Sequence, residues 1–359
     1  MAEGETRAGD TAMGITSVPA AIRWQADHAE ANGAPANARI IRALLAILET
    51  DTATGRRMAN WQGLSLEDAM PLRVASGLHY LYLTDAEPRL GDVYQGLMTD
   101  QPVIDELVAE TARSFDTILL PWLDTPPQTN EAGRSAAIMA GLLWLSERLG
   151  PQFALNEIGA SAGINTMMGR FHFDLGGVNV GPSLSSIAIA PQWRGEAPPE
   201  APVRIVGAKG CDTRPLDLTD PERALRLKSY IWPDARERMV RMDRAIAMAE
   251  KMPPEIVRQD AGDFVDQMLA APQDEGVTRV LFHTVMWQYL PRETRDRITQ
   301  AMETAGKDAG ADRPLAWLAL ETNRDTLTQE LRVRYWPGGG DARLLATAHP
   351  HGEWVEWLA

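Results

Sequence analysis

Hydrophobic spacing in the first part of the chain predicts helices. Apolar residues recur three and four positions apart in four stretches, the pattern of a helix with one buried face. The stripes are Ile40, Ile41, Leu44, Leu45 and Leu48; Leu66, Met70, Val74, Leu78 and Leu81; Ile104, Leu107, Val108, Thr111, Phe115 and Ile118; and Ile138, Leu142, Leu145 and Leu149. Asn130 is a capping candidate for the fourth helix, which Gly150 ends. We therefore predict a mobile tail at residues 1–17 and an all-helical subdomain at residues 18–150.

The pattern changes after Gly150. Short apolar runs at residues 153–158, 203–206, 255–258, 279–282 and 315–320 alternate with helical stretches at 221–227, 236–250, 264–270 and 292–305. Alternation of this kind is typical of parallel sheets with right-handed crossovers. The fold class is therefore α/β, with a Rossmann-like doubly wound sheet over residues 151–359.

Two segments depart from this alternation. Residues 331–336 and 342–347 flank a glycine-rich turn and predict an antiparallel hairpin, which would give the sheet the antiparallel last strand of class I methyltransferases. The glycine-rich stretch that begins at Phe171 delays the second strand, so we predict an insertion at about residues 171–202. It could form a small hairpin or lid near the binding turn, or a loop without a role.

Composition narrows the class of partner. The chain has 35 basic and 49 acidic residues, a net charge of −14, which disfavours nucleic acids and anionic membranes. The N-terminus lacks the features of a signal peptide, and no apolar run has the length of a membrane helix. The single Cys211 excludes an internal disulfide and fits a reducing compartment. We expect a cytoplasmic protein that acts on a small molecule, without nucleic-acid or membrane partners; its oligomeric state is open.

The first predicted strand leads into the sequence Glu-Ile-Gly-Ala-Ser-Ala-Gly at residues 157–163. Glycines between a strand and a helix let backbone atoms approach a ligand closely, and the N-terminus of the helix offers unpaired N–H groups. We expect that helix to begin near Ala162 and to run through Met168. This turn is the candidate ligand site.

Three chemistries fit a turn of this kind. Dinucleotide binding is disfavoured because Ser161 stands where G-x-G-x-x-G has its middle glycine. A serine hydrolase is favoured by the G-x-S-x-G match at residues 159–163, with Asp260 and then His349 or His351 in the expected chain order. However, helices rather than strands precede the turn, and Glu157 has no role in a hydrolase. An S-adenosylmethionine (SAM) site uses both features, since Glu157 could receive the ammonium group of the cofactor.

Five short motifs resemble a known bacterial family. They are NEIGASAGIN at 156–165, GCDTRPLD at 210–217, YIWPD at 230–234, FHT at 282–284 and AHPHG at 348–352. In this order they resemble domain of unknown function 2332, from about residue 20 to the end of the chain. That family is similar in fold to SAM-dependent methyltransferases, so the resemblance implies a Rossmann-like domain and no particular reaction.

In the SAM interpretation, candidate cofactor-binding residues follow successive strands. They are Glu157, Gly159, Ala160, Ser161, Gly163 and Asn165 in the turn, Asp212 for the ribose hydroxyls, and Asp260 and Ala261 beside the adenine. Asp217 is the alternative to Asp212, which could also serve only as a turn or capping residue. Asp263 is the candidate cap of the helix that follows Asp260.

His283 is the candidate catalytic residue, because it ends the fourth strand and could act as a general base. It could equally be a hydrogen-bonded core histidine.

Trp232, Asp234, Trp287 and Tyr289 are expected near the mouth of the cleft or in the core. His349 and His351 would need a third ligand such as Glu353 to bind a metal, so we predict no metal site; they and Glu321 are expected to shape the substrate pocket. The leading prediction is a SAM-dependent methyltransferase; the alternatives are a serine hydrolase that uses Ser161 and a non-catalytic nucleoside- or SAM-binding protein.

Overall fold

The apolar stripes of the N-terminal region form helices whose buried faces meet in one core. The computed structural model describes residues 15, 17–63, 65, 66 and 68–359. The chain divides into two compact units: unit 1 comprises residues up to Thr129 together with Pro221–Val240, and unit 2 comprises Asn130–Asp220 and Arg241–Ala359. The tail expected at residues 1–17 falls mostly outside the described residues.

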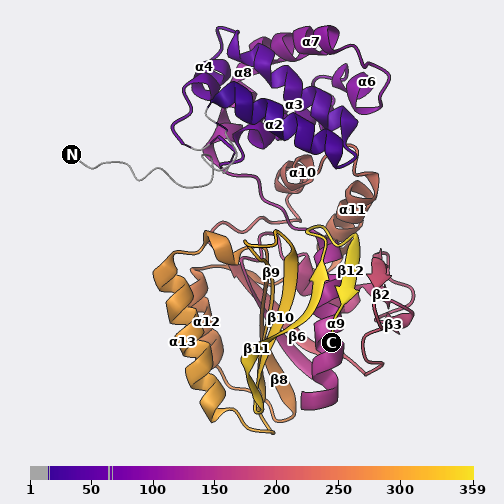
Figure 1. Ribbon diagram of the computed structural model, residues 1–359, viewed down its shortest axis with the longest axis vertical. Helices are drawn as coiled ribbons and strands as arrows, with labels where there is room; N and C mark the ends of the chain where they lie inside the picture. The colour runs from indigo at the N-terminus through magenta and orange to yellow at the C-terminus, as the bar shows by residue number, and fades with distance from the viewer. Residues whose placement is uncertain (1–14, 16, 64, 67) are drawn as a thin grey trace, which may run out of the picture. The chain divides into compact units, whose positions relative to one another are not determined.

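Unit 1 is helical (Figure 1). Its elements are α2 (Val18–Ala31), α3 (Pro35–Leu48), α4 (Ala53–Ala59), α5 (Met70–Leu83), α6 (Leu90–Tyr94), α7 (Gln101–Ser114), α8 (Asp116–Leu119), the 3-10 helix η1 (Leu120–Asp124) and α10 (Pro221–Ser229). Helix α3 packs against α2, α5 and α7 and places Ile40, Ile41 and Leu44 in the core. The third predicted stripe extends too far, because α7 ends at Ser114 and Ile118, in the separate α8, is 42% exposed.

The fourth predicted helix belongs to unit 2. Helix α9 (Ser135–Leu149) is apolar on all sides and packs against three strands of the sheet, so the unit boundary lies at Asn130 and not at residue 150. Asn130 does not cap α9. Its Oδ1 accepts a hydrogen bond from Ile164 N, 2.8 Å away, in the turn that follows the first strand.

The sheet of unit 2 has the order β5-β12-β11-β10-β9-β8-β1-β6-β7. Five strands run parallel: β1 (Gln152–Ile158), β6 (Arg204–Asp212), β7 (Ile256–Arg258), β8 (Val277–Thr284) and β9 (Leu315–Thr322). Helices α12 (Ala261–Ala270) and α13 (Arg292–Asp308) lie on one side of this sheet and α9 on the other (Figure 1). The chain adds β6 and β7 on one side of β1, then crosses to add β8 and β9 on the other, so the strand order reverses at β1. Open α/β sheets bind ligands at such a reversal.

The predicted hairpin is β10 (Gln329–Trp336) and β11 (Gly339–Ala348), which are antiparallel to each other. Strand β10 also pairs antiparallel with β9. Two short strands that the sequence did not predict, β12 (Trp354–Trp357) and β5 (Gln192–Arg194), extend the sheet beyond it. The structure is thus a mixed α/β fold with a large, mostly parallel sheet and a helical N-terminal region.

The predicted insertion forms its own small sheet of β2 (His172–Leu175), β3 (Val178–Val180) and β4 (Ala188–Ile189). Strands β2 and β3 are antiparallel neighbours joined at Gly176 and Gly177, which both have positive φ. The hairpin alternative for the insertion therefore describes this segment, and its last strand, β5, is part of the main sheet.

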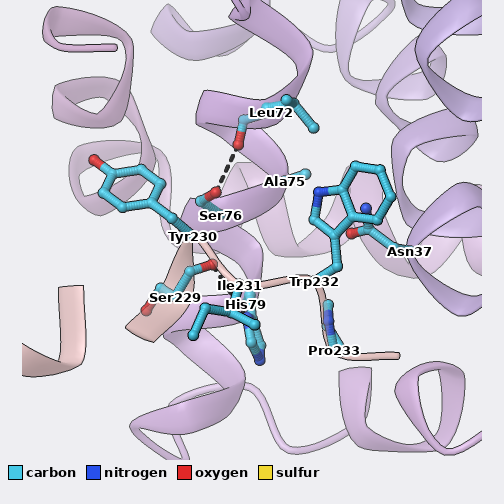
Figure 2. Close-up of a pocket in the computed structure, with 10 residues that line it drawn as sticks. All are labelled: Asn37, Leu72, Ala75, Ser76, His79, Ser229, Tyr230, Ile231, Trp232 and Pro233. Carbon is cyan, nitrogen blue, oxygen red and sulfur yellow. Dashed lines mark hydrogen bonds between the residues drawn. The ribbon is translucent and has the colours of Figure 1, made fainter. Parts of the chain in front are cut away.

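The YIWPD motif belongs to unit 1, where it binds two helices. The carboxylate of Asp234 accepts hydrogen bonds from Ala36 N and Asn37 N, at 3.0 and 2.9 Å, in the first turn of α3. Ala34, which precedes that helix, has no side-chain acceptor of its own, so Asp234 caps it from a distant part of the chain. One residue before the motif, Ser229 O lies 3.1 Å from Nδ1 of His79 in α5 (Figure 2).

His79 makes the stability of unit 1 depend on pH. Burial lowers the pKa of His79 from 6.5 to about 4. Between these pH values the unfolded chain binds a proton that the folded unit does not. The contribution of His79 to the free energy of unfolding is therefore complete above about pH 6.5 and falls as the pH drops towards 4. We expect the free energy of unfolding to decrease by up to about 3 kcal/mol from this group alone. Urea denaturation at several pH values compares the free energy of unfolding of the wild type with that of His79→Gln. If this free energy changes equally with pH in both proteins, the prediction is contradicted.

Candidate functional site

The turn after β1 adopts left-handed backbone conformations, which strain Ser161 but not the two glycines beside it. Gly159, Ser161 and Gly163 have φ values of +66°, +53° and +77°. Ala160 N donates to Cys211 O at 2.9 Å, and Gly163 N donates to Ala160 O at 2.7 Å. Because Cys211 lies in the neighbouring β6, the turn is tied to the carboxyl end of that strand.

The two glycines are required by contacts within the protein. A Cβ on Gly159 would lie 2.8 Å from the Met286 side chain, and a Cβ on Gly163 would lie 2.6 Å from Ile256. The predicted α-helix after the turn is instead the 3-10 helix η3 (Asn165–Arg170). Backbone N–H groups at the start of η3 are already hydrogen-bonded, since Ile164 N donates to Asn130 and Thr166 N donates to Gly163 O. Several N–H groups that the sequence suggested would be unpaired are therefore already used within the protein.

Glu157 lies at the end of β1 and is 1% exposed. Its Oε1 accepts a hydrogen bond from Asn165 Nδ2 at 3.4 Å, and its Oε2 is buried without a partner. Burial raises the pKa of Glu157 to about 8, against the lowering effects of the Asn165 hydrogen bond and the charge of Arg134. At neutral pH the carboxyl is therefore mainly protonated.

Two further oxygen atoms of the turn are buried without partners: Ser161 Oγ and Asn165 Oδ1. Ser161 is 6% exposed and Asn165 is fully buried. Together with Glu157 Oε2 they form the unsatisfied oxygens, the name used below for these three atoms. Buried polar atoms without partners are costly, and three of them between residues 157 and 165 suggest that a bound molecule or water completes their hydrogen bonds.

Ser161 is not part of an assembled hydrolytic triad. Its Oγ makes no hydrogen bond to a histidine or to any other described residue, although its positive φ resembles that of a strained nucleophile turn. His349 Nε2 lies 3.8 Å from Glu353 Oε2, and Asp260 caps a helix.

Asp212 supports the turn from the end of β6. Its Oδ2 accepts from Ser161 N and its Oδ1 from Arg214 N, both at 2.8 Å. Each oxygen keeps a second lone pair, so a ribose hydroxyl could still donate to it. The alternative candidate, Asp217, accepts from Thr219 N and Oγ1 in an exposed turn.

Asp260, and not Asp263, caps α12. Asp260 Oδ1 accepts from Gly262 N at 2.8 Å and from Asp263 N at 3.3 Å, while Asp263 pairs with Arg297. The prediction that Asp263 is the cap was wrong by three residues, because both aspartates precede the apolar residues of the helix. Ala261, the first residue of α12, is buried.

His283 ends β8 as expected, but both ring nitrogens are occupied. Trp317 Nε1 donates to His283 Nε2 at 3.0 Å, and His283 Nδ1 lies 2.6 Å from Glu321 Oε1. His283 is 1% exposed and stacks on Trp287. It is thus held by neighbours on both sides and has no free lone pair with which to take a substrate proton.

The segment Asn130–Arg134 supports the site, a role that was not predicted from the sequence. Glu131 Oε1 accepts from Gly133 N and from Arg241 Nε, and Arg134 Nε donates to Pro350 O at 2.8 Å. Through Asn130 the same segment holds Ile164, so it joins the AHPHG motif to the turn after β1. The dense run of polar residues and glycine at 130–134 was the available signal.

Other features of the described residues bear less on the site. Trp232 packs against the core of unit 1 and lines a small hollow with Asn37 and His79, of about 10 Å³, which is on the order of one water molecule (Figure 2). Tyr289 is 75% exposed. In the described part of the chain, no three or more histidine, cysteine or acidic side chains are grouped to hold a metal. None of the helices described is both long and apolar enough to cross a membrane.

Comparison with known proteins identifies a family and no function. No curated protein and no solved structure matches the chain, so these comparisons give no link to methyltransferases. The model of a family described as an uncharacterized protein conserved in bacteria, DUF2332, matches residues 19–357, and the chain therefore belongs to this family.

Proposed function

We propose that the protein is a SAM-dependent methyltransferase that acts on a small molecule. The observation that supports this most is the group of unsatisfied oxygens after β1: Glu157 Oε2, Ser161 Oγ and Asn165 Oδ1. All three can accept hydrogen bonds. A primary ammonium group has three N–H donors and no acceptor, so it is complementary to such a group. SAM carries an ammonium group of this kind.

Charge supports the same ligand. A carboxylate removed from water by burial is unfavourable, which is why the pKa of Glu157 is raised to about 8 despite the nearby charge of Arg134. A bound cation would stabilise the carboxylate and so release its proton. The turn is therefore suited to a ligand with a positive charge, and unsuited to the phosphates of a dinucleotide.

The remaining cofactor contacts follow from position along the sheet edge. Asp212 could accept from the ribose hydroxyls with its remaining lone pairs, and Asp260 and Ala261 would border the adenine. When bound, the sulfonium supplies a methyl group that an acceptor atom can attack. The protein must align that atom and exclude water.

Titration calorimetry with SAM and S-adenosylhomocysteine (SAH) tests this proposal. Both ligands should bind at submillimolar concentration or below, with a 1:1 stoichiometry. A folded sample that binds neither ligand would contradict the proposal. Binding of SAM without turnover across a broad panel of acceptors would favour a non-catalytic SAM-binding protein instead.

The second candidate is a serine hydrolase, favoured by the positive φ of Ser161 within a G-x-S-x-G sequence. A fluorophosphonate probe distinguishes the two. Labelling that disappears in Ser161→Ala would establish the hydrolase, whereas the methyltransferase proposal predicts no labelling at this serine.

A further inference from the structure

Glu321, at the carboxyl end of β9, is held in a fixed orientation by two neighbours. Its Oε1 accepts from Met286 N at 3.0 Å and lies 2.6 Å from His283 Nδ1. Its side chain is 19% exposed. No described residue donates a hydrogen bond to Oε2. One oxygen of this carboxylate is thus used for positioning, and the other is open.

The protonation of His283 follows from Trp317. An indole N–H can only donate, so His283 Nε2, 3.0 Å from Trp317 Nε1, must be the acceptor. The proton of the neutral imidazole is then on Nδ1, where it is donated to Glu321. Because Trp317 cannot accept a proton, the row Trp317–His283–Glu321 orients the carboxylate and does not carry protons away from it.

Glu321 lies at the same sheet edge as the turn after β1. Met286, which donates its backbone N–H to Glu321, packs its side chain against Gly159, where an added Cβ would be only 2.8 Å away. In register, β8 separates β1 from β9, with Glu157 beside Phe282 and His283 beside Ala319. Glu321 therefore lies at the same edge of the sheet as the turn, two strands from β1, and Met286 contacts both.

We propose that Glu321 is a catalytic residue of the methyl transfer, and that its Oε2 receives the proton of an amine or hydroxyl acceptor. This inference rests on the proposed methyltransferase function. The acceptor atom forms a bond to the methyl carbon while the carbon–sulfur bond breaks and leaves its electron pair on sulfur. The acceptor proton passes to Oε2 and later to water. His283 is a positioning residue.

The acceptor class follows from the same geometry. An open carboxylate oxygen requires a partner with an N–H or O–H, so a carbon or thioether nucleophile without such a proton would gain nothing from Glu321. Trp287 stacks on His283 with ring centroids 4.9 Å apart and covers that side of the pair. Primary and secondary amines, phenols and alcohols are thus the compounds to test.

The experiment measures SAH formation with a panel of such amines and hydroxyl compounds, and SAH binding by calorimetry in parallel. Glu321→Gln keeps the oxygen that accepts from His283 and Met286, so it should fold normally. We expect its kcat/KM to fall at least about 100-fold, while the Kd for SAH stays within about twofold. The matched control is Glu330→Gln, since Glu330 faces Glu321 across β9 and β10 but is paired with Arg332. This control should retain activity.

Variants of His283 test the positioning role. In His283→Asn the amide Nδ2 can take the place of Nδ1 as donor, whereas His283→Leu has no donor. The inference predicts that His283→Leu lowers kcat with little change in KM for the acceptor. It also predicts that His283→Asn keeps much of the wild-type kcat. Equal loss in both variants would contradict positioning through this hydrogen bond.

The outcomes separate this inference from the proposed function. If SAH binds and the kcat/KM of Glu321→Gln stays within threefold of the wild-type value, the role of Glu321 alone is overturned. The same holds if the wild type methylates other acceptors but no amine or hydroxyl compound. Absence of SAH binding in the wild type would overturn both. Carbodiimide-driven coupling of methylamine, read by peptide mass spectrometry, gives a readout without turnover: Glu321 should be modified in the free protein and protected by SAH. An unreactive Glu321 would overturn the inference.

Discussion

Replacement of Glu157 by glutamine should weaken SAH binding and at the same time stabilise the protein. Glutamine keeps the size of the side chain but cannot become a carboxylate. The loss of one charge-assisted hydrogen bond, about 1.5–3 kcal/mol, corresponds to about 10- to 100-fold weaker binding of SAH. Calorimetry on Glu157→Gln measures this change.

The stability change has the opposite sign. Since the pKa of Glu157 is about 8 in the folded protein and 4.5 ordinarily, the unfolded chain loses its proton first as the pH rises. The contribution of Glu157 to stability is complete below about pH 4.5 and is lost as the pH rises towards 8. Glutamine avoids this loss, so Glu157→Gln should be more stable at about pH 8, by up to about 5 kcal/mol.

Glu131 provides a matched control for this prediction. It is also buried, at 4% exposure, but it accepts hydrogen bonds from Gly133 N and Arg241 Nε. Glu131→Gln should therefore lower the free energy of unfolding, where Glu157→Gln raises it. A Glu157→Gln protein less stable than wild type at about pH 8 would show that the carboxyl is not an unsatisfied group.

The second large effect is expected at Gly352, in the AHPHG motif. Gly352 has φ of +76°, and a Cβ there would lie 2.3 Å from the backbone carbon of Gly133. Alanine would add about 1–2 kcal/mol of backbone strain and about 1–3 kcal/mol for the displacement of that backbone. We expect Gly352→Ala to lower the free energy of unfolding by about 2–5 kcal/mol, measured by urea denaturation.

Gly276 separates these two costs. Its φ of +74° is nearly the same, and an added Cβ would meet no atom within 4 Å. Gly276→Ala should therefore lose only the strain contribution, about 1–2 kcal/mol. Equal losses at both positions would mean that the close approach of Gly133 and Gly352 is unimportant. A larger loss at Gly352 would confirm that this approach holds the segment Asn130–Arg134.

Local patterns predicted most of the elements of the sheet and the turn after β1. The period of the apolar residues identified α3, α5 and α7 of unit 1, and the short apolar runs identified the parallel strands, because burial imposes those periods. They could not assign α9 to a unit, since a helix apolar on all sides packs equally well on helices or on a sheet. Nor could they foresee β12 and β5, whose pairing joins distant parts of the chain.

The candidate site shows the same division between local and distant information. Glu157 and Asp212 could be found because they lie near the carboxyl ends of strands whose apolar runs were predicted. The occupied nitrogens of His283 depend on Trp317 and Glu321, which lie on another strand and come together only in the fold. The choice between Asp260 and Asp263 as a cap depended on a helix boundary, which composition defines only within a few residues.

The most direct test of the ammonium site counts protons released when SAH binds. Calorimetry near pH 7 in two buffers of different ionisation enthalpy should give a release of close to one proton, because the cation drives Glu157 to ionise. 5′-Methylthioadenosine, which has the nucleoside and thioether but no ammonium group, should bind without this release, as should SAH with Glu157→Gln. Tight binding of SAH with no proton release in the wild type would contradict the assignment of Glu157, Ser161 and Asn165 as the cation site.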